Sequence, residues 1–250
     1  AEMKPNSNFA GFCATTGSAG TIGVGDYLKQ LFPTSKVVAS EALQCPTLLN
    51  NGFGAHRIEG IGDKHVPWIH NVKNTDMVTA IDDNSVVKIV RLFNESEGKQ
   101  YLAKKGVPEH IIQNLHLFGH SGIANMLTAI KFAKYYELTE DDIVLAVLTD
   151  SVELYDSRIV EYREQFGEFT SHDAAEAYAS ALMGESTDNL VELTYQDRKR
   201  VHNLKYYTWV EQQGKTYNEI MDQWYDKDYW TGFQSQLEEI DEYITEFNDR

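Results

Sequence analysis

The sequence is short of cysteine, of positive charge and of long apolar runs, and each shortage excludes a class of protein. Only Cys13 and Cys45 occur in 250 residues and they form no CxxC pair, so we expect two buried thiols rather than a disulfide framework or a cysteine zinc site. Lys and Arg total 22 against 38 Asp and Glu, for a formal net charge of −16. Because basic side chains supply most of the affinity for nucleic acids and anionic membranes, neither is expected as a partner.

Targeting and membrane signals are also missing from the printed sequence. No run of about 18 apolar residues could span a bilayer. The first residues, AEMKPNSNF, have neither the charged region nor the apolar core of a signal peptide. We therefore expect a cytoplasmic protein whose 42% hydrophobic residues build a large core.

Strand and helix patterns alternate in the first part of the chain. Residues 8–14 (NFAGFCA) predict a short buried strand, and the apolar spacing from Val24 to Leu31 is that of one helical face. Pro33 ends this helix, and residues 36–41 (KVVASE) predict a second strand. These elements form a β-α-β unit, for which right-handed parallel pairing is expected.

The alternation continues toward residue 150. Residues 76–82 predict a strand, residues 84–93 a helix, and a further helix begins near Ser121. The segment DIVLAVLTD at 142–150 is the strongest prediction of a buried strand. We therefore predict an α/β fold with a parallel sheet and helices on both faces.

The character of the sequence changes after about residue 160. The segments that follow are helical in period, charged and rich in aromatic residues, and none of them predicts a strand. We predict an incomplete α/β domain at 1–160 and a C-terminal helical extension at 161–250, with a boundary near Gly167 as an alternative.

A glycine-rich loop joins the first predicted strand to the first predicted helix, in the stretch ATTGSAGTIGVGDYLK. Gly17, Ser18, Ala19, Gly20 and Thr21 are small, and two of them carry hydroxyls. A helix N-terminus offers backbone N–H groups and a positive dipole end, which bind phosphate where small residues let it approach. The same residues also suit an ordinary tight turn, so the loop alone predicts an anion site only moderately.

Several nucleotide-binding loops compete for this stretch. No lysine follows Gly20, which excludes the nucleoside triphosphate loop. The spacing of the glycines differs from the GxGxxG dinucleotide fingerprint, but Glu41 stands where an acidic ribose ligand would be, so a nicotinamide cofactor remains an alternative.

A short-chain dehydrogenase would need a YxxxK pair. Two such pairs occur, Tyr101 with Lys105 and Tyr195 with Lys199. We interpret both as solvated helix faces that have this spacing by chance.

The segment TGSAGTIGVGDYLKQLFPTSKVVASEALQC resembles the phosphate loop, helix and following strand of the cysteine synthase and cystathionine β-synthase family, the fold-type II pyridoxal-phosphate enzymes. GAHRIEGIGDKHVP, GHSGIANMLTAIKFAK and DIVLAVLTDSVELYDSR resemble three further motifs of that family, in the same order. The resemblance covers about residues 8–160, the C-terminal part of the family's sequence. The order of four motifs makes it far more specific than any one of them.

The resemblance implies that pyridoxal 5′-phosphate is the cofactor. Gly17, Ser18, Ala19, Gly20 and Thr21 would hold its phosphate, and Ser121 would meet its pyridine nitrogen. A neutral serine at that nitrogen leaves it largely unprotonated, which favours β-elimination and β-replacement on an amino acid. A helix N-cap is the structural alternative for Ser121.

A second glycine loop, Gly60, Ile61 and Gly62, would approach the amino-acid substrate with backbone atoms. Three histidines between residues 56 and 70 lack the spacing of a metal site, so no metal is expected. His120 is expected to pack or to hydrogen-bond to backbone rather than to carry protons.

The family's Schiff-base lysine precedes its glycine loop, whereas only sixteen residues precede Gly17 here and Lys4 is their sole lysine. Lys64 could be a substitute, but nothing else favours it. We therefore expect the chain to depend on a missing N-terminal half or a partner chain, to be inactive alone, and to be a homo-oligomer. The aromatic-rich extension is either a self-packed core or an interface, and we expect it to pack against the missing half or a second subunit.

The sequence thus predicts a segment of a lyase or transferase of amino-acid metabolism that depends on pyridoxal phosphate and resembles cysteine synthase. Two alternatives stay open: a non-catalytic binding or scaffold subunit that keeps the fold, and an oxidoreductase that uses NAD(P) through Glu41.

Overall fold

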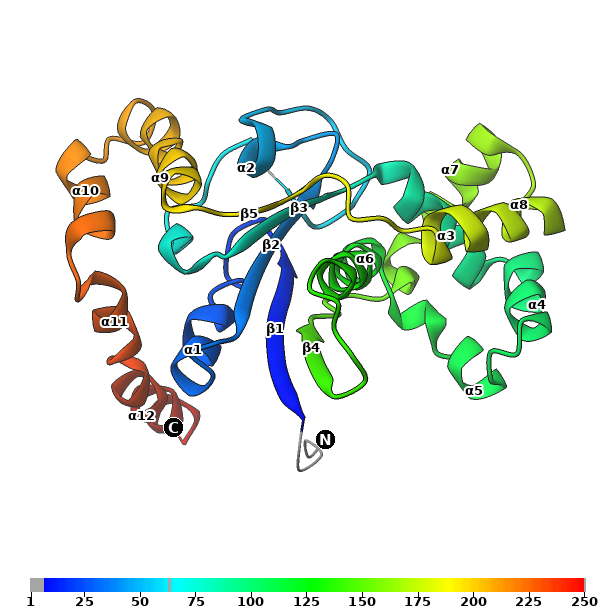
Figure 1. The fold of residues 1–250 in the computed structure, drawn as a ribbon, viewed down its shortest axis with the longest axis horizontal. Coiled ribbons are helices and arrows are strands. Elements are labelled where there is room, and N and C mark those ends of the chain that lie inside the picture. The colour runs from blue at the N-terminus through cyan, green and yellow to red at the C-terminus, as the bar shows by residue number, and fades with distance from the viewer. Residues whose placement is uncertain (1–6, 63, 250) are drawn as a thin grey trace.

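A five-stranded sheet with helices on both sides organises the computed structural model, which describes residues 7–62 and 64–249 (Figure 1). The strands lie in the order β4-β1-β2-β3-β5. Their bounds are Asn8–Thr15 for β1, Lys36–Ala42 for β2, Met77–Ile81 for β3, Asp142–Ala146 for β4 and Leu190–Glu192 for β5. The first four strands pair in parallel, whereas β5 pairs antiparallel with β3. The predicted α/β class with a helical extension is confirmed.

Helices cover the sheet and continue beyond it. The first part of the chain contributes α1 (Val24–Leu31), α2 (Thr47–Asn50), α3 (Asp83–Asn94), α4 (Ser96–Lys104), α5 (Glu109–Ile112), α6 (His120–Tyr135) and α7 (Asp156–Phe166). The later part contributes α8 (Ser171–Glu176), α9 (Tyr195–Asn203), α10 (Tyr217–Tyr225), α11 (Tyr229–Gln234) and α12 (Leu237–Asn248), with π-helical segments at Ala177–Met183 and Tyr206–Val210. No helix among the described residues is both long and apolar enough to cross a bilayer.

The alternation of side chains along β2 explains the two covered faces. Val37 and Ala39 belong to one buried cluster, whereas Val38 belongs to another that contains Phe132 of α6. Successive residues of a strand point to opposite faces, so a strand buried on both sides must be apolar throughout. Figure 1 shows α1 on one side of the sheet and α6 on the other.

The C-terminal extension is tied to the core by cationic side chains that end on backbone carbonyls. Lys205, fully buried, donates from Nζ to the carbonyls of Trp68 and His70, at 2.9 and 2.8 Å, and to Oε1 of Gln223 at 2.6 Å. Arg198 donates from Nε to the carbonyl of Thr75 at 2.6 Å. A buried cation needs such acceptors because desolvation otherwise destabilises it.

Two sequence predictions about strands were wrong. The segment 142–150 is not a long buried strand: β4 ends at Ala146, lies at the sheet edge and is only partly buried. A strand also returns after residue 160, because β5 adds to the sheet next to β3. Three residues are too few for a period-2 pattern to be recognised. The division at residue 160 stays a prediction, although β5 comes from its second part.

The apolar face predicted for the first helix is largely solvent-exposed. Val24, Tyr27 and Leu31 are 41%, 49% and 56% exposed. The contact with the sheet is made at Gly25, where a Cβ would come 2.6 Å from a methyl of Val37. Glycine therefore lets α1 approach β2 closely, and the apolar stripe faces outward.

A single buried amide joins the carboxyl ends of β1 and β4. The Oδ1 of Asn125, in α6, accepts from the backbone N–H of Thr15 at 2.6 Å, and its Nδ2 donates to the carbonyl of Val147 at 2.7 Å. Asn125 is fully buried. An unpaired polar group there could not be compensated by water.

Replacing Asn125 with Ala should lower the free energy of unfolding by about 2–5 kcal/mol, since it leaves one buried donor and one buried acceptor unpaired. Chemical denaturation followed by circular dichroism measures the change. Asn84→Ala, at an exposed position of α3, is the matched control and should alter stability by less than about 0.5 kcal/mol. Equal effects of the two substitutions would contradict the structural role of Asn125.

Candidate functional site

The glycine loop follows β1 and leads into α1. Among the described residues, no backbone N–H group from Gly17 to Ile22 has a hydrogen-bond acceptor, and the hydroxyls of Ser18 and Thr21 have no partner either. Ala19 has a φ of 68°, a left-handed conformation that is unfavourable for a residue with a Cβ. Such strain combined with successive free donors is typical of an anion-binding backbone.

The second glycine loop lies directly against the first. The N–H of Gly62 donates to the carbonyl of Thr16 at 2.7 Å, and a Cβ at Gly17 would come 3.7 Å from the carbonyl of Gly60. Gly60 and Gly62 have φ values of 77° and 70°. Glycine is required there because a side chain would be strained, and the Cβ of residue 62 would come 2.8 Å from the ring of His56. The structure thus brings together the two loops that the sequence singles out.

Ser121 lies in the first turn of α6 and is buried. Its Oγ is 2.6 Å from Oγ1 of Thr149 and donates to Oδ1 of Asp150 at 3.2 Å. Gly119, without a side-chain cap, precedes the helix, so the N-cap alternative for Ser121 was wrong. The hydroxyl is instead oriented by two residues that follow β4.

Asp150 collects hydroxyl groups from three residues. Tyr155 donates to its Oδ2, and Thr149 donates to its Oδ1 at 3.0 Å. The hydrogen bond to Asp150 raises the pKa of Tyr155 to about 12, because the carboxylate stabilises the phenol over the phenolate. The sequence prediction missed Thr149, Asp150 and Tyr155, because it placed Thr149 and Asp150 within a buried strand at 142–150.

His120 is packed beneath this cluster. Its Nε2 lies 2.8 Å from the hydroxyl of Tyr162, and its ring meets that of Tyr155 edge to face. Burial lowers the pKa of His120, so the neutral imidazole is favoured. His120 therefore packs as expected, but it hydrogen-bonds to a side chain rather than to backbone.

The two glycine loops and Ser121 lie where the strand order reverses. From β1 the chain proceeds to β2 and β3 in one direction, and it then places β4 on the other side of β1. The first glycine loop follows β1, Thr149 and Asp150 follow β4, and Asn125 links both strand ends to the α6 turn after Ser121. Ligands of open α/β sheets bind at the carboxyl ends of strands beside such a point.

The carboxylate of Glu41 is bound to backbone groups, which removes support for the alternative that it binds the ribose of a nicotinamide cofactor. Its carboxylate, 2% exposed, accepts from the backbone N–H groups of Leu48 and Leu49 at 2.9 and 2.8 Å at the start of α2. Burial raises the pKa of Glu41 to about 7, although these donors oppose the shift. A carboxyl group so placed binds the backbone at the start of α2 and is not available to a ribose.

The YxxxK pairs also have structural roles. Lys105 lies over the ring of Tyr101, with 5.3 Å from Nζ to the ring centroid. The prediction of a solvated face was wrong for Lys199, whose Nζ is buried over the rings of Trp224 and Tyr225. No group of three or more His, Cys, Asp or Glu within the described ranges is arranged to hold a metal ion.

Glu41 should make stability fall as the pH rises. A folded-state pKa near 7, against 4.5 for the unfolded chain, means that the folded state holds an extra proton between these values, and its stabilising effect is lost through pH 7. Relative to Glu41→Gln, the wild type should lose up to about 3 kcal/mol between pH 4.5 and 8. Denaturant titrations across this range measure the difference, with exposed Glu140→Gln as the control. A wild-type minus Glu41→Gln difference that does not vary with pH would contradict this role.

Known proteins match about three fifths of the chain. Cysteine synthase B of Campylobacter jejuni is 30% identical over 145 residues, which cover 58% of this chain and 42% of that protein. A probable cysteine synthase of Bacillus subtilis is likewise 30% identical over 58% of this chain, and cystathionine beta-synthase of Saccharomyces cerevisiae is 28% identical over 62%. The matched region spans less than half the length of each of these relatives. No protein-family model matches the chain.

The solved structures that are similar to this chain are described as enzymes of related kinds. A hydrogen sulfide-producing enzyme from Fusobacterium nucleatum has a TM-score of 0.49 and 24% identity, and the alignment covers 75% of this chain and 49% of that one. An O-acetylserine dependent cystathionine beta-synthase from Helicobacter pylori has a TM-score of 0.46 and 29% identity, with 60% and 43% covered. The curated sequence matches alone confirm the resemblance that the four motifs predict: about three fifths of this chain resembles the cysteine synthase and cystathionine β-synthase family of fold-type II enzymes.

Proposed function

We propose that this chain is the part of an enzyme dependent on pyridoxal 5′-phosphate that holds the cofactor's phosphate, and that the complete enzyme catalyses β-elimination or β-replacement on an amino acid. The observation that carries the proposal is the run of backbone N–H groups at 17–22 that have no acceptor within residues 7–62 and 64–249, next to the loop at 60–62. The resemblance to cysteine synthases supports the same reaction class.

The residues present fit a phosphate group. Gly17, Ser18, Ala19, Gly20 and Thr21 offer backbone donors at a helix N-terminus, and Ser18 and Thr21 add hydroxyls. A Cβ at Gly20 would have no heavy atom within 4 Å, so a ligand can reach this backbone. We propose that these five residues hold the phosphate.

The cofactor, when bound, withdraws electrons from the α-carbon of an amino acid so that a substituent on the β-carbon can leave. We propose that Ser121 meets its ring nitrogen, and the hydrogen bonds of Ser121 refine its role. The hydroxyl of Ser121 lies 2.6 Å from that of Thr149 and 3.2 Å from Oδ1 of Asp150, so these two neighbours orient it.

We propose that Gly60, Ile61 and Gly62 close over the amino-acid substrate with backbone atoms. Their positive φ values and contact with Gly17 support a role at the same ligand.

The lysine that carries the cofactor is proposed to come from protein outside these 250 residues, as an N-terminal half or a partner chain. Lys4 lies outside the described residues. Exposed apolar side chains near the site support an additional covering segment: Tyr27 and Leu31 on α1, and Leu145 and Leu148 at the β4 edge. An open strand edge and an apolar helix face are surfaces that proteins normally cover.

The 250-residue chain should bind pyridoxal phosphate weakly through its phosphate. Gly20→Asp should abolish binding, because a carboxylate repels the anion at a position where a Cβ fits, whereas the neutral Gly20→Asn should retain most of it. Fluorescence titration with pyridoxal phosphate and with inorganic phosphate measures affinity, and thermal melting checks the fold. Equal binding by both variants would argue against the loop as the phosphate site.

The same chain should show no turnover of serine, O-acetylserine or cysteine, since it lacks the lysine that the resemblance places before the glycine loop. Sulfide and pyruvate assays measure this, and visible absorbance reports a lysine-linked cofactor. Lys64→Ala should leave the absorbance unchanged. Activity in the wild-type chain that Lys64→Ala abolishes would contradict the proposal, whereas phosphate binding without activity in any reconstituted complex would favour a non-catalytic subunit.

A further inference from the structure

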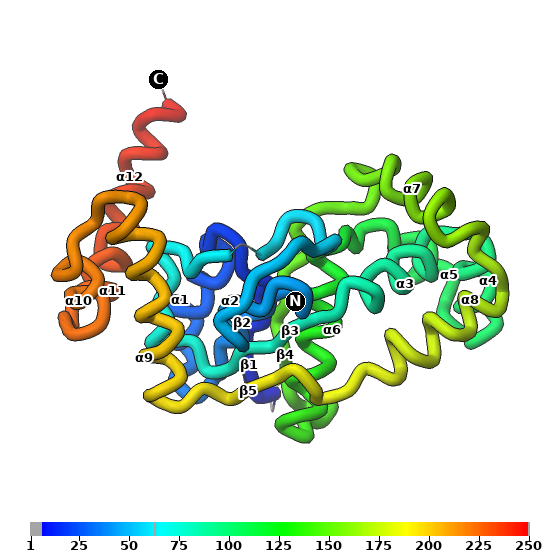
Figure 2. The backbone as a smooth tube through the Cα atoms, turned by 90° about the horizontal axis from the view of Figure 1, so that it is seen from above, coloured from blue at the N-terminus to red at the C-terminus, as the bar shows by residue number. Residues whose placement is uncertain are grey.

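The last helix of the chain, α12 (Leu237–Asn248), carries an apolar stripe that no other described residue covers. Leu237, Ile240, Ile244 and Phe247 follow helical spacing and are 45–75% exposed. None of the twelve residues of α12 is buried, and Figure 2 shows the helix standing away from the rest of the molecule. An isolated helix of this length is only marginally stable in water, so we expect its apolar stripe to pack against a partner surface.

The remaining surface of α12 is acidic. Residues 237–249 contain six carboxylates and no Lys or Arg. Glu238 and Glu242, and likewise Glu242 and Glu246, are four residues apart, where like charges repel. Two copies of α12 packed on each other would bring two acidic faces together, so the surface that receives the stripe should be cationic.

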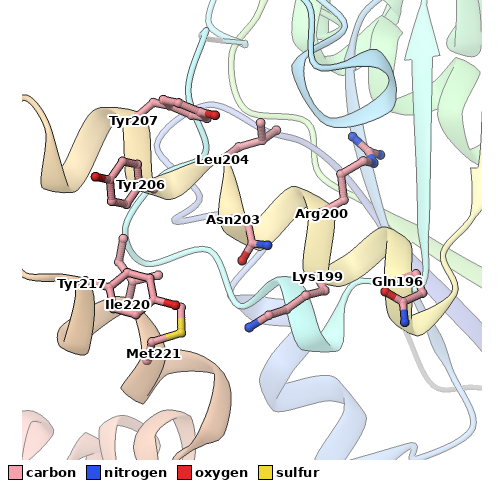
Figure 3. A pocket seen from close by; sticks show the side chains of 10 residues that line it. All are labelled: Gln196, Lys199, Arg200, Asn203, Leu204, Tyr206, Tyr207, Tyr217, Ile220 and Met221. Carbon is pink, nitrogen blue, oxygen red and sulfur yellow. The ribbon is translucent and has the colours of Figure 1, made fainter.

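A cleft of about 580 Å³ between α9 and α10 has the complementary composition (Figure 3). Its apolar and aromatic lining comes from Leu204, Tyr206, Tyr207, Tyr217, Ile220 and Met221. The charged residues that line it are Lys199 and Arg200, and none of the lining residues is acidic. An acid-free cleft is unusual in a chain with a net charge of −16, and aromatic lining is typical of interfaces.

Lys199 is the cation in this cleft whose head group lacks an acceptor. Its Nζ lies 4.5 Å from the ring centroids of Trp224 and Tyr225 and makes no hydrogen bond within the described chain. Arg200, in contrast, already donates to the carbonyl of Leu48 at 2.8 Å. Lys199 and Arg200 give the cleft a positive potential that complements the acidic surface of α12, and this complementarity would set the position of the helix in the cleft.

We propose that α12 of one copy docks into the α9–α10 cleft of a second copy. Within one chain, α10, α11 and α12 follow one another away from α9, so the helix lies at the far end of this row from the cleft (Figure 1). Each copy presents both surfaces, and two reciprocal contacts close a twofold dimer. The inference is independent of the cofactor, because neither surface includes the glycine loops or Ser121.

The mass of the 250-residue chain in solution tests the dimer. Light scattering after size exclusion at 1–200 µM should give twice 28.4 kDa, with dissociation at high salt because the charge contact is screened. The double variant Ile240→Asp/Ile244→Asp and the single variants Tyr207→Glu and Lys199→Gln should each weaken dimerisation at least tenfold. Ile240, Ile244 and Tyr207 are exposed, so their substitution should leave thermal melting unchanged.

Two controls make the result decisive. Met183→Asp, at an apolar position that is 60% exposed on a different part of the surface, should leave the dimer intact. A photo-crosslinking residue in place of Phe247 should join isotopically labelled and unlabelled copies, with linked peptides between residues 196 and 221. A monomer at 200 µM, a dimer that survives both α12 and cleft variants, or crosslinks that map elsewhere would overturn the proposal.

Discussion

The buried amide of Asn125 holds the carboxyl ends of β1 and β4 to a single turn of α6. These two strands flank the point where the sheet order reverses, so their ends would otherwise diverge around the site. The glycine loop leaves one of these ends, and Thr149 and Asp150 leave the other. The side chain of Asn125 therefore fixes the position of the glycine loop, the proposed phosphate site, relative to Thr149 and Asp150, which orient Ser121.

The residues around Asp150 form a small network with a definite direction of hydrogen bonding. Tyr155 donates to Asp150, and the hydroxyls of Ser121 and Thr149 lie 2.6 Å apart and form a short chain that ends on the same carboxylate. The hydroxyl of Ser121 is consequently polarised by the carboxylate of Asp150, although Ser121 itself is neutral. A single carboxylate behind a neutral serine can give that serine part of the character of an acid residue, without placing charge in the site.

The sequence was sufficient for elements with long apolar runs or distinctive loops. The strands β1, β2 and β3 and the helices α1, α3 and α6 follow from local pattern, whereas the contact between the two glycine loops is known only from the structure. Local pattern could not predict that β4 lies at an edge, because an apolar segment has the same appearance whether or not a neighbouring strand exists. Thr149 and Asp150 were missed for the same reason, since their partners come from α6, almost 30 residues earlier. The periodicity of α1 predicted its apolar stripe but not that the stripe is solvent-exposed, because periodicity does not show what covers a stripe.

The C-terminal extension has two parts that differ in how tightly they are packed on the α/β core: α9 and α10 are held firmly, and α12 is not. Around Lys205, three acceptors and fully buried surroundings hold α9 and α10 on the core, whereas no residue of α12 is buried. Exposing Lys205 would break its hydrogen bonds to the segment around His70, so α9 and α10 can open only together with part of the α/β core. The backbone amides of these two helices should therefore exchange with solvent as slowly as those of the sheet, while the amides of α12 exchange through local fraying. In hydrogen exchange, the part of the chain that unfolds together with the α/β core is therefore expected to end inside the extension, after α10.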